Sequence, residues 1–258
     1  MTPIFDTHAH YDDKAFDEDR EELLISLPAQ GIGRVVNVGS SLDSCKMTLN
    51  LMDCYEYIYG AIGIHPSDTA KLTEGDMDWL QVHCGHGKCV AVGEIGLDYY
   101  WGEPERELQK KWFVRQLELA RQVKKPVIIH SREAARDTAD ILTAERAREM
   151  GGVIHCYSYT KETAKTYLDM GFFFGIGGVL TFRNARKLKE AVEYIPIDRI
   201  VLETDCPYLA PVPNRGKRNS SLNLPYVVTA MARIKGLDEE EVRKITWENA
   251  LQLYHMKE

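Results

Sequence analysis

Short apolar runs alternate with helix-like segments along all 258 residues, and this alternation constrains the fold more than any other feature of the chain. Several runs are continuously apolar, such as Val-Ile-Ile at 127–129 and Ile-Val-Leu at 200–202, as expected of strands that helices cover on both faces. Eight strands are predicted, at residues 4–8, 34–38, 60–64, 90–95, 126–130, 152–155, 172–177 and 199–204. Eight strand–helix units in succession predict one α/β domain over residues 1–258, folded as a (β/α)8 TIM barrel.

A doubly wound open sheet is the second interpretation of the same alternation. The chain lacks Gly-x-Gly-x-x-Gly after the first strand, which weakens a dinucleotide-binding version of that fold. Residues 105–124 carry one broad apolar face, and residues 224–231 repeat apolar side chains at helical spacing. Asp238 followed by Glu241 has the spacing of a capping box, which predicts the start of the last helical region.

Composition narrows the class of protein. A net charge of -7 argues against a broad, nonspecific duplex-binding surface, although it leaves room for a local basic patch near a site. We see no basic segment followed by an apolar stretch at the N-terminus and no apolar run of membrane-spanning length. The six cysteines form no Cys-x-x-Cys pair and suggest no disulfide framework. These observations predict a cytoplasmic protein with reduced thiols and no membrane or obligate protein partner.

Two histidines one residue apart, His8 and His10, end the first predicted strand. Side chains at i and i+2 of a strand point to the same side, so both imidazoles should project together. Two neighbouring imidazoles make half of a site for a transition metal. A pair of solvent-facing loop histidines is the alternative that this motif alone leaves open.

Histidines and carboxylates recur where other predicted strands end. They are His65, Glu94, His130, His155, Glu203 and Asp205. Taken singly, His130 and His155 are more often hydrogen-bonded structural histidines than ligands. The carboxyl ends of barrel strands converge on one mouth, however, and that is where the active sites of barrel enzymes lie. So many nitrogen and oxygen ligands suit two divalent ions, with one carboxylate able to bridge them.

Seven segments in order resemble the TatD family of metal-dependent deoxyribonucleases, within the amidohydrolase superfamily. They are Phe-Asp-Thr-His-Ala-His at 5–10, Gly-Ile-His-Pro at 63–66, Gly-Glu-Ile-Gly-Leu-Asp-Tyr-Tyr-Trp at 93–101, Lys-Pro-Val-Ile-Ile-His-Ser-Arg-Glu at 125–133, His-Cys-Tyr-Ser at 155–158, Leu-Glu-Thr-Asp-Cys-Pro-Tyr-Leu at 202–209 and Arg-Gly-Lys-Arg-Asn at 215–219. The chain departs from the family at Ser67 and Ser221, where the family often has histidine and proline. These departures touch no expected ligand.

The resemblance implies a barrel with two divalent ions, whose identity among Zn, Mn, Mg, Ni and Co stays open. One ion would be held by His8, His10 and Asp205 and the other by His130 and His155. Glu94 would bridge the two ions, and we also expect Asp205 to act as general base.

Further residues are expected to contact the substrate. Arg132, Lys217 and Arg218 would offer cations to phosphate, and Asn219 would donate a hydrogen bond. Trp101 belongs to an aromatic run on which bases could stack, with loop packing as an equal alternative. The remaining two residues are ambiguous: His65 either contacts phosphate or supports a ligand, and Glu203 either supports a ligand or touches an extra ion. Cys156 and Cys206, which directly follow expected ligands, are interpreted as packing residues.

The leading hypothesis for function is a divalent-metal-dependent nuclease, specifically an exonuclease acting on single-stranded DNA or DNA ends. A small-molecule amidohydrolase or esterase on the same two-metal barrel is the alternative, because a fold does not fix its chemistry. A binding protein that kept the fold without catalysis is disfavoured, since it predicts a degraded ligand set.

Overall fold

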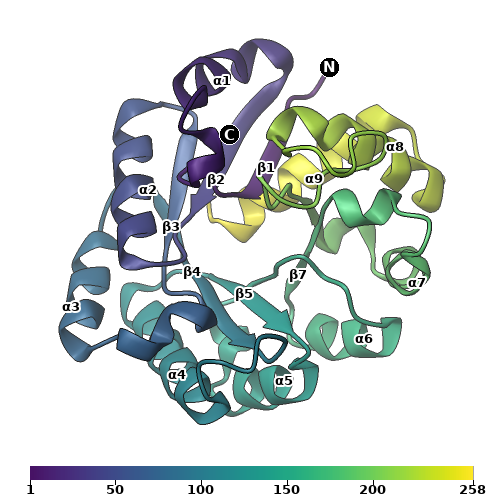
Figure 1. Cartoon of the computed structure of the whole chain (residues 1–258). Helices are drawn as coiled ribbons and strands as arrows, with labels where there is room; N and C mark the ends of the chain where they lie inside the picture. Colours follow the sequence, from purple (N-terminus) through teal and green to yellow (C-terminus); the bar gives the residue numbers. More distant parts are fainter. Residues whose placement is uncertain (258) are drawn as a thin grey trace.

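The computed structural model describes residues 1–257, which form one eight-stranded parallel sheet in the order β1-β2-β3-β4-β5-β6-β7-β8 (Figure 1). The strands are β1 (Ile4–Ala9), β2 (Ile32–Val38), β3 (Ile58–Ile62), β4 (Cys89–Asp98), β5 (Val127–Arg132), β6 (Gly152–Ile154), β7 (Phe173–Ile176) and β8 (Ile200–Leu202). Each overlaps one predicted strand. Because neighbours in the sheet are also neighbours in sequence, the (β/α)8 barrel is confirmed and the doubly wound order is wrong.

The helices surround the barrel (Figure 1). The α-helices are α1 (Arg20–Ser26), α2 (Leu42–Cys54), α3 (Glu74–His83), α4 (Arg106–Val123), α5 (Ala135–Ala144), α6 (Lys161–Asp169), α7 (Arg186–Tyr194), α8 (Leu224–Lys235) and α9 (Glu239–Leu253). Short 3-10 helices are η1 (Lys14–Phe16), η2 (Pro28–Gln30), η3 (Pro66–Lys71), η4 (Ala147–Glu149), η5 (Gly178–Thr181), η6 (Ile197–Arg199) and η7 (Ser221–Asn223). The predicted capping box at Asp238 and Glu241 is present and begins α9.

The barrel closes where the end of β1 meets the segment after β8. Ala9 and Cys206 form an isolated parallel bridge, and the amide of Asp205 donates to the carbonyl of His8 at 3.0 Å. Buried Asp6 strengthens this seam, because its carboxylate accepts from the amide of Thr204 at 3.0 Å and from the Thr204 hydroxyl at 2.8 Å. Closure therefore fixes Asp205 next to His8 in β1 and His10 directly after it.

The barrel interior is packed with side chains at the end where the strands begin. Every strand contributes at least one residue to a buried cluster that also includes the last turns of α9. At that end the hydroxyl of Tyr254 donates to the carbonyl of Thr7 at 2.9 Å, across the whole length of the sequence. Because side chains fill the interior at this end, a ligand can enter only from the opposite mouth, where the strands end.

The described residues also bear on two other expectations. In residues 1–257, none of the helices combines the length and the apolar character that crossing a bilayer requires. All six cysteines are free thiols, as their spacing predicts.

Candidate metal centre

A cavity of about 720 Å³ opens at the mouth where the strands end. Residues at the ends of the strands and in the loops that follow them line it, so segments far apart in sequence meet there. Its lining includes the following predicted site residues: His10, His65, Glu94, Trp101, Arg132, His130, His155 and Asp205.

His8 in β1 and His10, directly after the strand, point to the same place, as alternation along an extended chain predicts. The Nε2 atoms of His8 and His10 lie 3.0 Å apart. The Nδ1 of His10 lies 2.8 Å from the carbonyl oxygen of Val38, which can only accept. A neutral His10 bound in this way keeps its proton on Nδ1 and turns the lone pair of Nε2 toward His8, the tautomer that a metal ligand needs.

Glu94 lies at the centre of the cluster, and its two oxygens face different histidines. Oε2 lies 3.5 Å from Nε2 of His8 and 3.7 Å from Nε2 of His10. Oε1 lies 2.7 Å from Nδ1 of His130 and 3.5 Å from Nε2 of His155. Each oxygen can therefore serve one pair of nitrogens, which is the geometry of a bridging carboxylate.

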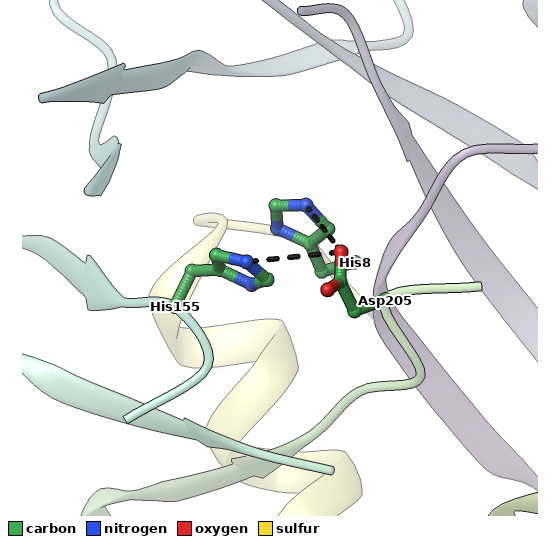
Figure 2. Close-up of side chains that lie close together, drawn as sticks. All are labelled: His8, His155 and Asp205. Carbon is green, nitrogen blue, oxygen red and sulfur yellow. Dashed lines mark ion pairs between the residues drawn. The ribbon is translucent and has the colours of Figure 1, made fainter. Parts of the chain in front are cut away.

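His155, which follows β6, and Asp205, which follows β8, complete the cluster beside His8 (Figure 2). Oδ1 of Asp205 lies 3.9 Å from Nε2 of His8 and 3.8 Å from Nε2 of His155. The rings of His8 and His155 stack with centroids 3.6 Å apart. Asp205 has a φ of 55°, a left-handed conformation that aspartate tolerates better than most residues. This turn brings its carboxylate back over the mouth.

Asp98 joins the cluster although the sequence reasoning assigned it no role. Its Oδ2 lies 3.1 Å from Nε2 of His130, and together with His65 they form a further group able to hold a cation. The signal was present in the sequence: β4 continues to Asp98, so Glu94 and Asp98 fall on the same face at i and i+4. Predicting the end of this strand at residue 95 concealed the second carboxylate.

Glu203 is buried behind His155. Its Oε1 accepts a hydrogen bond from the amide of Cys156 at 2.6 Å and lies 3.2 Å from Nδ1 of His155. Space for this carboxylate exists because residue 175 is glycine, where a Cβ atom would meet Oε2 of Glu203 at 2.0 Å. Against the effect of burial, the charge of this carboxylate favours the protonated imidazole and raises the pKa of His155.

The two cysteines beside expected ligands differ in their surroundings. Cys206 is fully buried, in agreement with a packing role. Cys156 instead lines the mouth, because β6 ends at Ile154 and strand alternation no longer applies at residue 156. Strand alternation therefore gives no support to the packing interpretation of Cys156.

Burial and charge shift the pKa values of the cluster strongly. Burial alone would lower the pKa of His10 and His155, but facing carboxylates raise them to about 9 and about 10. Burial alone would raise the pKa of Glu94, yet the surrounding histidines hold it well below its ordinary value. Burial, with His130 beside it, lowers the pKa of His65 to about 3. Cationic imidazoles thus balance the buried carboxylates.

The donor set fits divalent metal ions. Five overlapping groups of three histidine, carboxylate or thiol side chains have ligand atoms within 4.8 Å of one another, and Glu94 belongs to two of them. The Nδ1 atoms of His8 and His155 and Oε2 of Glu203 are buried without a hydrogen-bond partner. Imidazole and carboxylate ligands suit Zn and other divalent first-row ions. A metal ion would replace the protons that the cluster now uses to balance its charge.

The expected substrate residues divide into two groups. Arg132 and Trp101 line the cavity, where the guanidinium lies 5.6 Å from the Trp101 ring centroid and 3.8 Å from that of Tyr100. Lys217 and Arg218 do not line it. Both terminal nitrogens of Arg218 contact the carboxylate of Asp19, at 2.6 and 2.5 Å.

Asn219 and the two family departures have local structural partners. Asn219 is fully buried, and its side-chain nitrogen donates to the carbonyl of Thr204 at 3.0 Å. Ser221 donates to Asp6 at 2.6 Å, and the amide of Ser67 donates to Nδ1 of His65 at 3.1 Å. These contacts hold the loops around the mouth, so the predicted substrate contact of Asn219 has no support in its position.

A (β/α)8 barrel with clustered imidazole and carboxylate ligands at its mouth defines the class of metal-dependent hydrolases. Comparison with known families identifies the family within this class. A family model described as TatD related DNase matches residues 5–255, and the chain belongs to this family. It is a metal-dependent hydrolase of the TatD family, as the resemblance implied.

Individual relatives support the same assignment. The chain is 41% identical over 253 residues to the uncharacterized metal-dependent hydrolase YabD of Bacillus subtilis, covering 98% of this chain and 99% of the relative. It is 30% identical over 257 residues to the 3'-5' ssDNA/RNA exonuclease TatD of Cronobacter sakazakii, covering 97% of each. The crystal structure of YJJV, a TatD homologue from Escherichia coli, matches with a TM-score of 0.92 at 28% identity over 98% of both chains.

Proposed function

We propose that this protein hydrolyses phosphodiester bonds with two divalent ions and removes nucleotides from the ends of single-stranded DNA. The observation that carries the proposal is Glu94, whose two carboxylate oxygens face two different pairs of histidines. The exonuclease name of the Cronobacter relative supports the substrate class.

We assign the ligands as the resemblance to the family implies. His8, His10 and Asp205 would hold one ion, His130 and His155 would hold the other, and Glu94 would bridge. When bound, such ions polarise a phosphoryl oxygen and lower the pKa of a water.

Asp205 is the residue that we propose as the general base. Its side chain is 18% exposed, against 5% for Glu94, so it reaches the cavity where water and substrate enter. The nearby histidines hold its pKa below the ordinary value despite burial. Its carboxylate is therefore ionised at neutral pH and ready to accept a proton at Oδ1 or Oδ2.

Three residues at the mouth are proposed to contact the substrate: Arg132, Trp101 and His65. Arg132 presents a guanidinium to phosphate, and the 66% exposed ring of Trp101 offers a stacking face to a base. With its low pKa, His65 stays neutral and offers a hydrogen bond rather than a charge.

The test is nucleotide release from 5'- or 3'-labelled single-stranded DNA by protein reconstituted with Mg, Mn, Zn or Co. We expect a metal-dependent ladder of products that Asp205→Asn abolishes and Asp68→Asn leaves intact. Asp68 is the matched control, because it is an exposed carboxylate in the lining of the same cavity. Absence of product with every metal, while metal remains bound, would overturn the proposal.

Hydrolysis of a small-molecule ester or amide is the second candidate, and the charge of the mouth favours it. The lining holds six carboxylates and only one guanidinium, that of Arg132, which is an unusual surface for a polyanion. Turnover of neutral esters or lactones without nucleotide release would select this candidate.

A further inference from the structure

The mouth alone supplies too little positive charge to retain a nucleic acid strand. Six carboxylates in its lining face the single guanidinium of Arg132. The four positive charges of two divalent ions leave this lining negative. Retention of a polyanion depends largely on contacts between cations and phosphates, so a strand whose end reaches the mouth needs further cations outside it.

Two more hollows lie beside the mouth, along η5 and the start of α7. Val179 lines the mouth, and the next two residues, Leu180 and Thr181, line a second hollow of about 450 Å³. Arg183 lines a third hollow of about 600 Å³. The second and third hollows share Arg233. One short segment of chain thus leads continuously from the cavity to the face between α7 and α8, which are neighbours in Figure 1.

The loop after β8 packs directly on η5 and contributes to the same surface. Gly178 packs so closely on this loop that a Cβ atom would meet the carbonyl oxygen of Leu209 at 2.1 Å. The amide of Val212 donates to the hydroxyl of Thr181 at 2.8 Å. The guanidinium of Arg215 lies over the ring of Phe182 at 4.4 Å. These contacts hold η5 firmly against the loop after β8, so the path runs over a fixed surface that both segments form.

Cations outnumber carboxylates along the outer part of the path. The third hollow is lined by Arg183, Arg186, Lys189 and Arg233, together with the carboxylates Glu190 and Glu193. Glu190 pairs with Arg186 at 2.8 Å. Arg183 and Arg233 are exposed and, within residues 1–257, have no side-chain hydrogen bond or ion pair. They are free to contact phosphates.

Exposed apolar and aromatic side chains lie between the mouth and these arginines. Leu209 borders the mouth and is 37% exposed, while Val212 and Tyr226 of the second hollow are 45% and 42% exposed. An unpaired base can stack on the Tyr226 ring without sequence preference and pack against the aliphatic side chains, whereas the bases of a duplex are already stacked on each other. The combination with flanking arginines favours a single strand.

We propose that these two hollows form a track for the continuing part of a single-stranded polynucleotide whose end occupies the mouth. We define the track by Leu180, Thr181, Arg183, Val212, Tyr226 and Arg233. The proposal rests on the proposed function, since it extends the same site from a terminal nucleotide to a polymer. If the track binds the strand, the affinity of the protein for single-stranded DNA depends on the length of the DNA and on the salt concentration.

The test compares the double variant Arg183→Ala/Arg233→Ala with a charge-matched control, Arg148→Ala/Lys257→Ala. The control residues lie near the opposite end of the barrel, where the strands begin. Hydrolysis of a thymidine dinucleotide and of a 15-residue oligothymidylate is measured with metal-loaded protein. Binding of a phosphorothioate 15-mer, which resists hydrolysis, is followed by fluorescence anisotropy over a range of salt concentrations.

In the track variant we expect the KM and Kd for 15-mers to rise about five- to ten-fold, because each lost phosphate contact weakens binding by a modest factor. The slope of log Kd against log salt should fall by about 1.4, for two contacts to a single strand. The kcat/KM for the dinucleotide should not change. The control variant should behave like the wild type in all three measurements.

Unchanged 15-mer binding in the track variant, or an equal loss in the control, would overturn the track. A proportional loss for the dinucleotide would also overturn it, since that substrate is too short to leave the mouth. Loss of 15-mer binding in a protein that hydrolyses neither substrate would support the track and refute the proposed nuclease function.

Discussion

Replacing Glu94 by glutamine tests the bridging role with little change of shape. The substitution removes one negative charge that lies 2.7 to 3.7 Å from nitrogens of His8, His10, His130 and His155. Each ion would take its place between such a nitrogen pair and Glu94. At an effective dielectric constant of about 20, two opposite unit charges about 4 Å apart attract each other by roughly 4 kcal/mol. Because Glu94 would share its one charge between two divalent ions, each ion would lose about this much. Every 1.4 kcal/mol is a factor of ten.

We therefore expect both ions to bind about a thousand-fold more weakly in Glu94→Gln, and activity to fall at least as much. The assay is metal content by elemental analysis after dialysis, together with nucleotide release at saturating metal. Asp68→Asn is the control, because it makes the same chemical change in the same cavity away from the histidines. Two tightly retained ions in Glu94→Gln would refute the bridging assignment, and loss of one ion only would refute its symmetry.

Three other predictions follow from the same structure. Metal binding at pH 7 should release protons, because His10 and His155 have pKa values raised to about 9 and about 10 and must lose a proton to become ligands. The affinity for metal should therefore weaken as pH falls, up to ten-fold per pH unit for each proton released. Metal binding that calorimetry finds to be independent of pH would contradict this prediction. Gly175→Ala should destabilise the fold by about 1–3 kcal/mol in thermal denaturation, because its Cβ would collide with Glu203, whereas Gly87→Ala, which meets no atom within 4 Å, should be neutral. Trp101→Ala should raise the KM for single-stranded DNA several-fold while metal content stays unchanged, and an unchanged KM would remove this ring from the substrate contacts.

The number and order of the strands can be predicted from local sequence patterns, but the exact residues at which the strands end cannot. Short apolar runs, several of them continuous, identify all eight strands because both faces of a barrel strand are buried. Their ends are less accurate: β4 extends to Asp98 and β6 stops at Ile154. Strand ends in a barrel depend on pairing with neighbours, as where Asp98 pairs with Arg132 of β5, and this information is not local in sequence.

The candidate site was predictable where side chains lie on strands and less so where they lie on loops. Alternation along β1 places His8 and His10 together, and convergence of strand ends brings in Glu94, His130 and His155. The expected cations of the loop after β8 follow no such rule. Arg218 turns to Asp19, a residue about 200 positions earlier, and only the closed barrel makes that contact visible.

Anomalous diffraction from crystals grown with manganese would test the central claim most directly. The account predicts two manganese peaks at the mouth, one between Glu94 and the His8–His10 pair and the other between Glu94 and the His130–His155 pair. A single peak, or peaks that do not contact Glu94, would contradict the two-ion centre on which the proposed hydrolysis rests.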